Sequence, residues 1–179
     1  MVKKENVHNL IGIITDEVVQ DAMNWFIDRA LSHDNDPLYL LINSGGGGIS
    51  TTFALIDLIL TSKANHRLHT IALGQASSMA IPLFLCGSRR IIGPRAKMIF
   101  HHLGQGVDKE ERWPLEEIRR IKIDLEKSED FYSEILLERC GIPTDVTLSF
   151  FEPERTIYAN ELVKLGIAHE IMSPGNSIF

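Results

Sequence analysis

The sequence predicts an α/β protein built from repeated βαβ units, with one long helix in its C-terminal half. Short apolar runs, typical of buried parallel strands, alternate with stretches whose apolar residues recur at helical spacing. The longest helical stretch covers about residues 114–140. Because strand–helix–strand repeats place successive strands parallel with right-handed crossovers, we expect a largely parallel sheet.

Length and composition bound the class of protein. A chain of 179 residues fits a single domain spanning 1–179. Its hydrophobic share of 44% and charged share of 23% exclude a disordered chain and a membrane protein. The net charge of −6, without a basic run, argues against nucleic acid as a partner.

The expected location follows from apolar runs and cysteines. No stretch approaches the roughly 20 apolar residues of a transmembrane helix, and the run 10–14 is too short for a signal peptide. Cys86 and Cys140 lack the spacing of a metal site, so two free thiols in a reducing compartment are expected. We therefore expect a cytoplasmic protein with no membrane partner and no cofactor or metal.

The predicted elements of the N-terminal half are strands and helices in alternation. In chain order they are a strand at 10–14, a helix at 18–31, a strand at 38–42, a helix at 49–60 and a strand at 69–73. A glycine loop, 43–48, lies between the second strand and the second helix. It is not a phosphate loop, because neither Gly-Lys-Ser/Thr nor Gly-x-Gly-x-x-Gly spacing is present. Its glycines suit either a flexible turn or a backbone that approaches a ligand closely, and a turn would not need four.

The C-terminal half contains the long helix. In chain order we expect a helix at 79–86, strands at 89–92 and 97–100 joined by a Gly93-Pro94 turn, a loop at 104–113, the helix at 114–140, an irregular segment at 153–157, a helix at 159–165 and a strand at 168–172. Pro114 suits the start of the long helix and Gly141 its end. One side carries an apolar stripe and the other carries charges that include Glu126 and Glu129. At 1.5 Å per residue this helix is nearly 40 Å long, so we expect part of the stripe to contact another subunit.

Two residue types along this path can carry chemistry. Ser78 lies at a strand-to-helix junction, where its hydroxyl is exposed at the sheet edge and free N–H groups can bind an oxyanion. The alternative is a helix N-cap, the commonest role of a serine before a helix. His101 and His102 end the strand at 97–100, on opposite faces, so at most one of them can meet the serine. A histidine there is either a structural hydrogen-bonding group or the base that an activated serine needs.

Four segments, taken in order, indicate a family. They are Ile42-Asn-Ser-Gly-Gly-Gly-Gly48, Gly74-Gln-Ala-Ser-Ser-Met79, Met98-Ile-Phe-His101 and Tyr158-Ala-Asn-Glu-Leu-Val-Lys-Leu-Gly-Ile167. Together they resemble the Clp protease proteolytic subunit (ClpP) family of serine peptidases. Its pattern is Ile-Asn-Ser-Pro-Gly-Gly, Gly-Gln-Ala-Ala-Ser-Met-Gly, Met-Ile-His, and an Arg-Asp segment before a Ser-Ala-x-Glu-Ala helix. The resemblance implies a ClpP/crotonase-type fold.

The resemblance also implies a mechanism and an assembly. By position, Ser78 is the nucleophile, His101 the general base, and the N–H groups of Gly47 and Met79 the oxyanion hole. The implied activity is a serine endopeptidase that cleaves peptides or unfolded proteins through an acyl-enzyme. The family forms stacked heptameric rings, so a homo-oligomer, as a heptamer or tetradecamer, is implied, with the long helix between rings.

Three departures from the family pattern qualify these implications. The catalytic aspartate of the family falls at Glu154, with Glu152 as a rival two residues earlier. Gly45 replaces the proline of the glycine loop, and Ala80 the glycine after Ser-Met. The sequence also begins almost at the first predicted strand, where the family carries its pore-lining segment. This last departure weighs against a Clp-type ATPase partner.

Other interpretations stay open. A crotonase-like acyl-CoA enzyme would share the fold but would leave Ser78 and His101 without a role. A catalytically weak or inactive ring subunit is consistent with the substitution at Glu154. A Ser–Lys peptidase would need a lysine near the serine. A metal site made of His66, His69 and His169 is discounted, because their spacing is loose.

Overall fold

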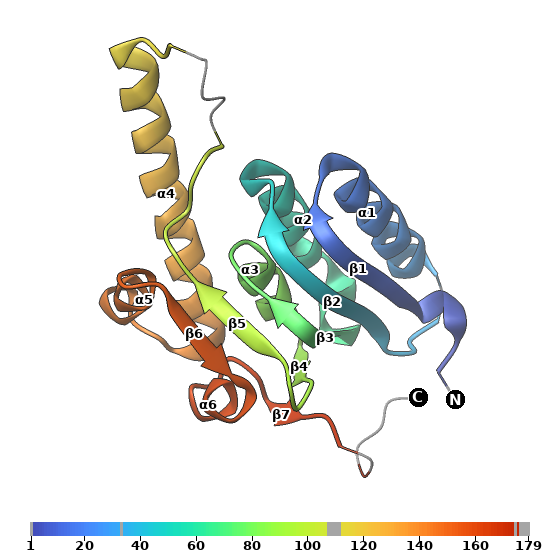
Figure 1. Cartoon of the computed structure of the whole chain (residues 1–179). Coiled ribbons are helices and arrows are strands. Elements are labelled where there is room, and N and C mark those ends of the chain that lie inside the picture. Colours follow the sequence, from blue (N-terminus) through green and yellow to red (C-terminus); the bar gives the residue numbers. More distant parts are fainter. Residues whose placement is uncertain (1, 33, 107–111, 174, 176–179) are drawn as a thin grey trace.

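The computed structural model describes residues 2–32, 34–106, 112–173 and 175, and it confirms the α/β class (Figure 1). The elements in chain order are η1 (Lys4–Asn6), β1 (Val7–Ile14), α1 (Asp16–Leu31), β2 (Leu38–Gly47), α2 (Ile49–Thr61), η2 (Lys63–Arg67), β3 (Leu68–Ala76), α3 (Ala80–Leu85), β4 (Arg89–Ile92), β5 (Lys97–Phe100), α4 (Leu115–Cys140), α5 (Thr144–Phe151), β6 (Arg155–Tyr158), α6 (Ala159–Lys164) and β7 (Glu170–Ile171).

The sheet is parallel, as predicted, apart from the pair β5–β6. The order β1-β2-β3-β4-β7 runs parallel throughout. Strand β5 leaves this path: it pairs with the end of β3 at Gln75↔Lys97 and runs antiparallel to β6. The turn after β4, where the Ala96 N–H donates to the Gly93 carbonyl at 3.0 Å, redirects the chain. Strands β4 and β5, predicted at these bounds, are therefore consecutive but not paired.

Helices α1, α2 and α3 pack side by side over one face of the sheet (Figure 1). Helix α1 forms where the sequence places good N-terminal signals. Thr15 caps it by accepting from the N–H of Val18, and two acidic residues occupy its first turn. Its apolar stripe, Val19, Ala22 and Phe26, is buried. Helix α3 lies against β2 and β3 and is buried along its whole length. It also contacts α2 and α4.

Helix α4 has two halves with different surroundings. In the C-terminal half, Tyr132, Ile135 and Leu136 are buried in the core, and Gly141 ends the helix in a left-handed conformation at φ 70°. The N-terminal half stands clear of the body of the molecule (Figure 1). There Ile118 is 51% exposed. The predicted stripe is therefore covered within this chain only at one end.

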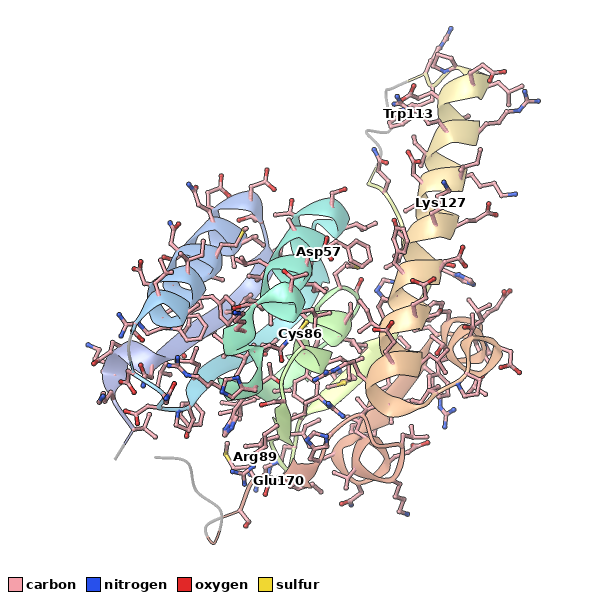
Figure 2. All side chains as sticks on the ribbon, turned by 180° about the vertical axis from the view of Figure 1, so that it is seen from behind. Asp57, Cys86, Arg89, Trp113, Lys127 and Glu170 are labelled. Atoms are coloured by element: carbon pink, nitrogen blue, oxygen red, sulfur yellow. The ribbon has the colours of Figure 1, made fainter. Side chains whose placement is uncertain are left out.

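The N-terminal tip of helix α4 lies far from the sheet. Figure 2 shows Trp113 beside this tip and Lys127 midway along the helix. Contact of this half with another subunit stays a prediction.

The glycine stretch is not a loop, which corrects the sequence-based prediction. Strand β2 continues from Leu38 through Gly47, and its last residues pair with β1 as Ile13↔Gly46 and Ile14↔Gly47. Residues without side chains gave no apolar alternation by which a strand could be recognised. Extending β2 carries its end past the end of β3.

Two elements near the C-terminus were also not predicted. The segment expected to be irregular at 153–157 contains most of β6, and α5 precedes it. Only Ile157 of the four residues of β6 is buried, so no alternating pattern marks the strand. Helix α5 spans two turns, too few for a clear apolar period. Of the predicted loop 104–113, residues 107–111 lie outside the described residues.

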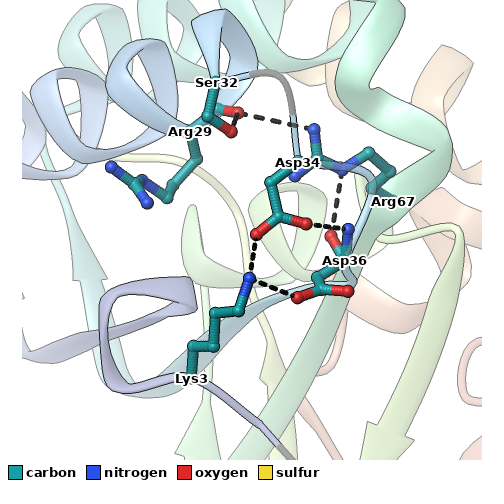
Figure 3. Close-up of polar contacts among 6 residues, drawn as sticks. All are labelled: Lys3, Arg29, Ser32, Asp34, Asp36 and Arg67. Atoms are coloured by element: carbon teal, nitrogen blue, oxygen red, sulfur yellow. Dashed lines mark hydrogen bonds and ion pairs between the residues drawn. The ribbon is translucent and has the colours of Figure 1, made fainter.

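The N-terminal segment is attached by charge to the connection between α1 and β2 (Figure 3). The Lys3 ammonium lies 2.5 Å from an oxygen of Asp34 and 2.8 Å from one of Asp36. These hydrogen bonds raise the pKa of Lys3, and the hydrogen bond from Lys3 lowers the pKa of Asp34. All three groups are in contact with water, so this cluster adds little stability.

Candidate active site

The serine predicted as nucleophile occupies a strained turn. Strand β3 ends at Ala76 and α3 begins at Ala80, which leaves three residues to reverse the chain. Among described residues other than glycine, only Ser78 has a positive φ, at 53°. A side chain in this left-handed region costs free energy, and the surrounding structure has to compensate for it. Ser78 is half-buried, and its hydroxyl makes no hydrogen bond within the described part of the chain.

Neighbouring strands hold the serine turn on both sides. The Ser77 N–H donates to the Ser44 carbonyl of β2 at 3.0 Å. The Ser78 N–H donates to the Ile99 carbonyl of β5 at 3.1 Å, and the Ile99 N–H donates to the Ser77 hydroxyl at 3.2 Å. Ser77 is buried and has a structural role through this bond. The two serines therefore differ: Ser77 joins the turn to β5, and Ser78 presents its hydroxyl.

The end of β2 approaches the serine turn at a distance that only glycine permits. A Cβ atom on Gly46 would lie 2.6 Å from the Cβ of Ser78 and 3.1 Å from the N of Met79. A Cβ on Gly47 would lie 2.3 Å from the Ile14 carbonyl oxygen of β1. The Met79 N–H has no acceptor among the described residues, and the residue itself is fully buried beneath the end of β2. The predicted oxyanion-hole residues Gly47 and Met79 thus belong to segments that meet here.

The two histidines lie beyond β5, not on it. Strand β5 ends at Phe100, so strand alternation does not apply to them, and the prediction that they lie on opposite strand faces was wrong. His101 is half-buried, and its Nδ1 lies 2.6 Å from the carbonyl oxygen of His102. Its Nε2 makes no hydrogen bond in the described part of the structure. Ile99, whose backbone bonds to the serine turn, precedes His101 by two residues. The same short segment of chain therefore holds the serine turn and carries the His101 side chain.

His102 is engaged elsewhere. Its Nδ1 lies 3.0 Å from an oxygen of Glu129, and its Nε2 lies 3.6 Å from an oxygen of Glu152. The ring also packs edge-on against Phe151, with centroids 5.6 Å apart. The hydrogen bond with Glu129 is the largest cause of a raised pKa at His102. Of the two histidines, His101 is the one with a ring nitrogen, Nε2, that has no partner in the described part of the structure.

Glu154 lies in the turn between α5 and β6. The register of β5 with β6 pairs Phe100 with Arg155, and continuing it by one residue would set Glu154 opposite His101. The Glu154 side chain is exposed and makes no hydrogen bond or ion pair with any described residue. Glu152, the rival acid, is directed to His102. Of the two carboxylates, Glu152 contacts His102, and neither is joined to His101 in the described part of the structure.

A cleft of about 510 Å³ opens beside the glycine run. It is lined by Gly47, Gly48, Ile49, Ser50, Thr51, Gly104, Gln105, Gly106, Ile121, Asp124, Leu125 and Ser128. One wall is therefore the end of β2, and the opposite wall is α4. A larger groove of about 660 Å³ lies between α2 and α4, where Phe53 and Phe131 pack edge to face. Neither the groove nor the cleft is lined by Ser78 or His101, and the cleft adjoins the candidate site only through Gly47.

Comparison with known families agrees with this geometry. The family model described as Clp protease matches residues 1–175. The chain belongs to the Clp protease family. This assigns a ClpP-type peptidase fold and the general class of peptidases. Clp proteases generally form ring oligomers that bind protein substrates.

Other kinds of site find no support in the described part of this Clp protease. Within it, no group of three or more His, Cys, Asp or Glu side chains is arranged to hold a metal ion. None of its described helices has the length and apolarity to cross a membrane. Burial raises the pKa of the Cys86 thiol to about 12, so this cysteine is not a reactive thiolate.

One acidic residue that contacts the segment of the two histidines was not singled out from the sequence. Glu129 of α4 was assigned to the charged side of the helix, yet its side chain is only 14% exposed. It accepts hydrogen bonds from His102 and from the backbone N–H of Leu103 at 2.8 Å. Nothing in its helical spacing distinguishes it from Glu126, one turn earlier, so the sequence alone carried no signal.

Proposed function

We propose that this chain is a serine endopeptidase of the ClpP type that cleaves peptides or unfolded proteins through an acyl-enzyme. Ser78 is the nucleophile and His101 the general base. The N–H groups of Gly47 and Met79 form the oxyanion hole, and Glu154 occupies the position of the family acid. No cofactor takes part in this reaction.

The reaction is an acyl transfer in two steps. Ser78 Oγ attacks the peptide carbonyl while His101 Nε2 takes the hydroxyl proton, and the imidazolium then gives that proton to the leaving amine. Water attacks the acyl-enzyme in the second step, with His101 again as base. Backbone N–H groups stabilise the oxyanion of each tetrahedral intermediate, and such donors supply a large share of the rate enhancement.

The strained conformation of Ser78 is the observation that carries this proposal. A φ of 53° at a non-glycine residue, held by bonds from β2 and β5, costs free energy that a simple helix cap does not require. Gly46 approaches the same turn, so the geometry is enforced from a third side.

Hydrolysis of short fluorogenic peptides tests the proposal. Wild-type protein should cleave them slowly, because Glu154 makes no hydrogen bond to the base. Ser78→Ala and His101→Ala should each abolish the cleavage. Unchanged cleavage in either variant would overturn the assignment of that residue.

The proposed assembly is a ring-type homo-oligomer, a heptamer or tetradecamer, located in the cytoplasm. Its support is the N-terminal half of α4, where Leu115, Ile118 and Ile123 are exposed. Enclosure in a ring would place the serine turns around a chamber that admits only unfolded chains.

A second candidate is a catalytically weak or inactive ring subunit, and Phe100 favours it. In the family pattern the histidine directly follows Met-Ile, whereas here Phe100 follows Met98-Ile99 and His101 comes one residue later. The Phe100 ring is fully buried against Phe150 and cannot act as a base. In this alternative the fold and the ring remain, and peptide cleavage is absent in the wild type.

A further inference from the structure

The hydrogen bond at His101 Nδ1 defines which nitrogen can act as a base. Nδ1 lies 2.6 Å from the His102 carbonyl oxygen, and a carbonyl oxygen can only accept. Nδ1 must therefore carry the proton in the neutral ring. That tautomer leaves the lone pair on Nε2, which is the nitrogen a general base needs.

A carboxylate is bound at the other end of the same peptide group. The His102 carbonyl and the Leu103 N–H belong to one planar amide. The Leu103 N–H donates to Oε1 of Glu129 at 2.8 Å. Imidazole, amide and carboxylate thus form a continuous chain of hydrogen bonds from His101 to Glu129.

The burial of Glu129 strengthens its effect on this chain. Its side chain is 14% exposed, whereas that of Glu152 is 86% exposed. A charge shielded from water is less screened, and successive hydrogen bonds polarise one another. A carboxylate at the amide N–H therefore draws negative charge onto the His102 carbonyl oxygen, which makes it a better acceptor for His101.

We propose that Glu129 is the positioning acid of this site, acting on His101 through the His102–Leu103 peptide bond. This inference rests on the proposed role of His101 as the base. No proton passes through the amide: Nε2 gains the proton of Ser78, Nδ1 keeps its own, and Glu129 stays ionised. The carboxylate holds the ring in its reactive tautomer and stabilises the imidazolium. Glu154, which has no hydrogen bond to the ring, then contributes less.

The charged groups around Glu129 come from three elements. His102 contacts it from the segment after β5, Lys122 and Glu126 lie along the same shallow depression on α4, and Glu152 contacts the far side of the His102 ring from the turn after α5. Glu126 is an exposed acid that pairs only weakly with Lys122, at 3.5 Å. It sits three residues before Glu129 on the same helix, so Glu126→Gln is a matched control that removes one charge without touching the amide.

NMR titration of the His101 ring tests the inference in the full chain carrying Ser78→Ala, where no turnover interferes. Glu129→Gln keeps an oxygen that can accept from Leu103 but loses the charge, so it should lower the pKa of His101. Glu126→Gln should leave that pKa in place. In the active protein, Glu129→Gln should lower kcat by about tenfold and change KM by no more than about twofold. This loss of kcat is much smaller than the one caused by replacing an acid that is hydrogen-bonded directly to the base. Glu154→Gln should have the smaller effect on kcat.

Two results would overturn the inference. An unchanged His101 pKa in Glu129→Gln, or equal shifts in Glu129→Gln and Glu126→Gln, would remove any specific action of this carboxylate. The tautomer of the His101 imidazole gives a second test, which needs no variant at position 129. The neutral imidazole must carry its proton on Nδ1. A proton on Nε2 would contradict the proposal. Because these readouts need no catalysis, they stay decisive even if peptide cleavage is never found.

Discussion

Gly46 and Ser78 approach each other more closely than any other residue at position 46 would allow, since a Cβ there would lie 2.6 Å from the Cβ of Ser78. Gly46 also has a φ of 99°, which other residues rarely adopt. Gly46→Ala should therefore cost about 1–3 kcal/mol of unfolding free energy and displace the serine turn. Urea unfolding measures the first effect and peptide cleavage the second.

Gly45→Ala is the matched control. A Cβ there would meet only the side-chain nitrogen of Gln75, at 3.4 Å, so stability should change by less than about 1 kcal/mol. Equal losses in the two variants would show that the approach of β2 to the serine does not depend on position 46.

Arg90 should be a large contributor to stability. It is 4% exposed, and its guanidinium donates to backbone carbonyls of Ile167 at 2.8 Å, Gly166 at 3.0 Å and Arg139 at 3.1 Å. Arg90→Met should cost about 2–4 kcal/mol, because buried carbonyls lose their donors.

The neighbouring arginine provides the comparison for Arg90. Arg89 forms a partly exposed ion pair with Glu170, and the two are seen together in Figure 2. Arg89→Met should cost less than about 1 kcal/mol in the same urea measurement. A loss at Arg89 as large as that at Arg90 would contradict the assignment of the carbonyl network.

Stability should fall as the pH drops below the ordinary histidine pKa of 6.5. Burial lowers the pKa of His8, His69 and His169 in the folded state. Protons then bind the unfolded chain more readily, so the stability present above 6.5 is lost as the pH falls. His102 has a raised pKa and acts in the opposite direction, but it is one exposed group against three.

Urea midpoints at about pH 7.5 and about pH 5.5 test this sign. The midpoint should be lower at the acidic value, and His102→Gln should make the drop larger. A midpoint that rises on acidification would show that His102, or a group outside these four, dominates.

Oligomer formation should depend on one side of α4. Ile118 is 51% exposed in the half of the helix that stands clear of the body. Ile118→Glu should shift a ring-sized species toward smaller ones in light scattering, because a charge would have to be buried. Lys127→Glu, nine positions later and about 180° around the helix, should leave the size unchanged. A wild-type monomer at micromolar concentration would contradict the ring.

The sequence predicted the elements that carry apolar periodicity and missed those that do not. Helix α4 and strands β4 and β5 were found within about a residue of their bounds, because buried positions recur along them. The end of β2 was missed because Gly45, Gly46 and Gly47 have no side chains to alternate.

For the site, the order of segments led to the prediction of Ser78 and His101, which stays a prediction, and local spacing could not show three-dimensional contacts. Glu129 meets the His102–Leu103 peptide only because α4 packs beside the end of β5. A contact between residues 26 positions apart cannot be recognised from the apolar periodicity of a helix. The position of Phe100 directly after Met98-Ile99 can be read from the sequence, and the structure adds that its ring is buried.

Labelling of the intact protein by a fluorophosphonate tests the central claim most directly, because the probe reacts only with an activated serine. We predict labelling of the wild type at Ser78, loss of labelling in Ser78→Ala, and its retention in Ser77→Ala, whose hydroxyl serves the Ile99 N–H. Absence of labelling in folded wild-type protein, or equal labelling of both serine variants, would contradict the account.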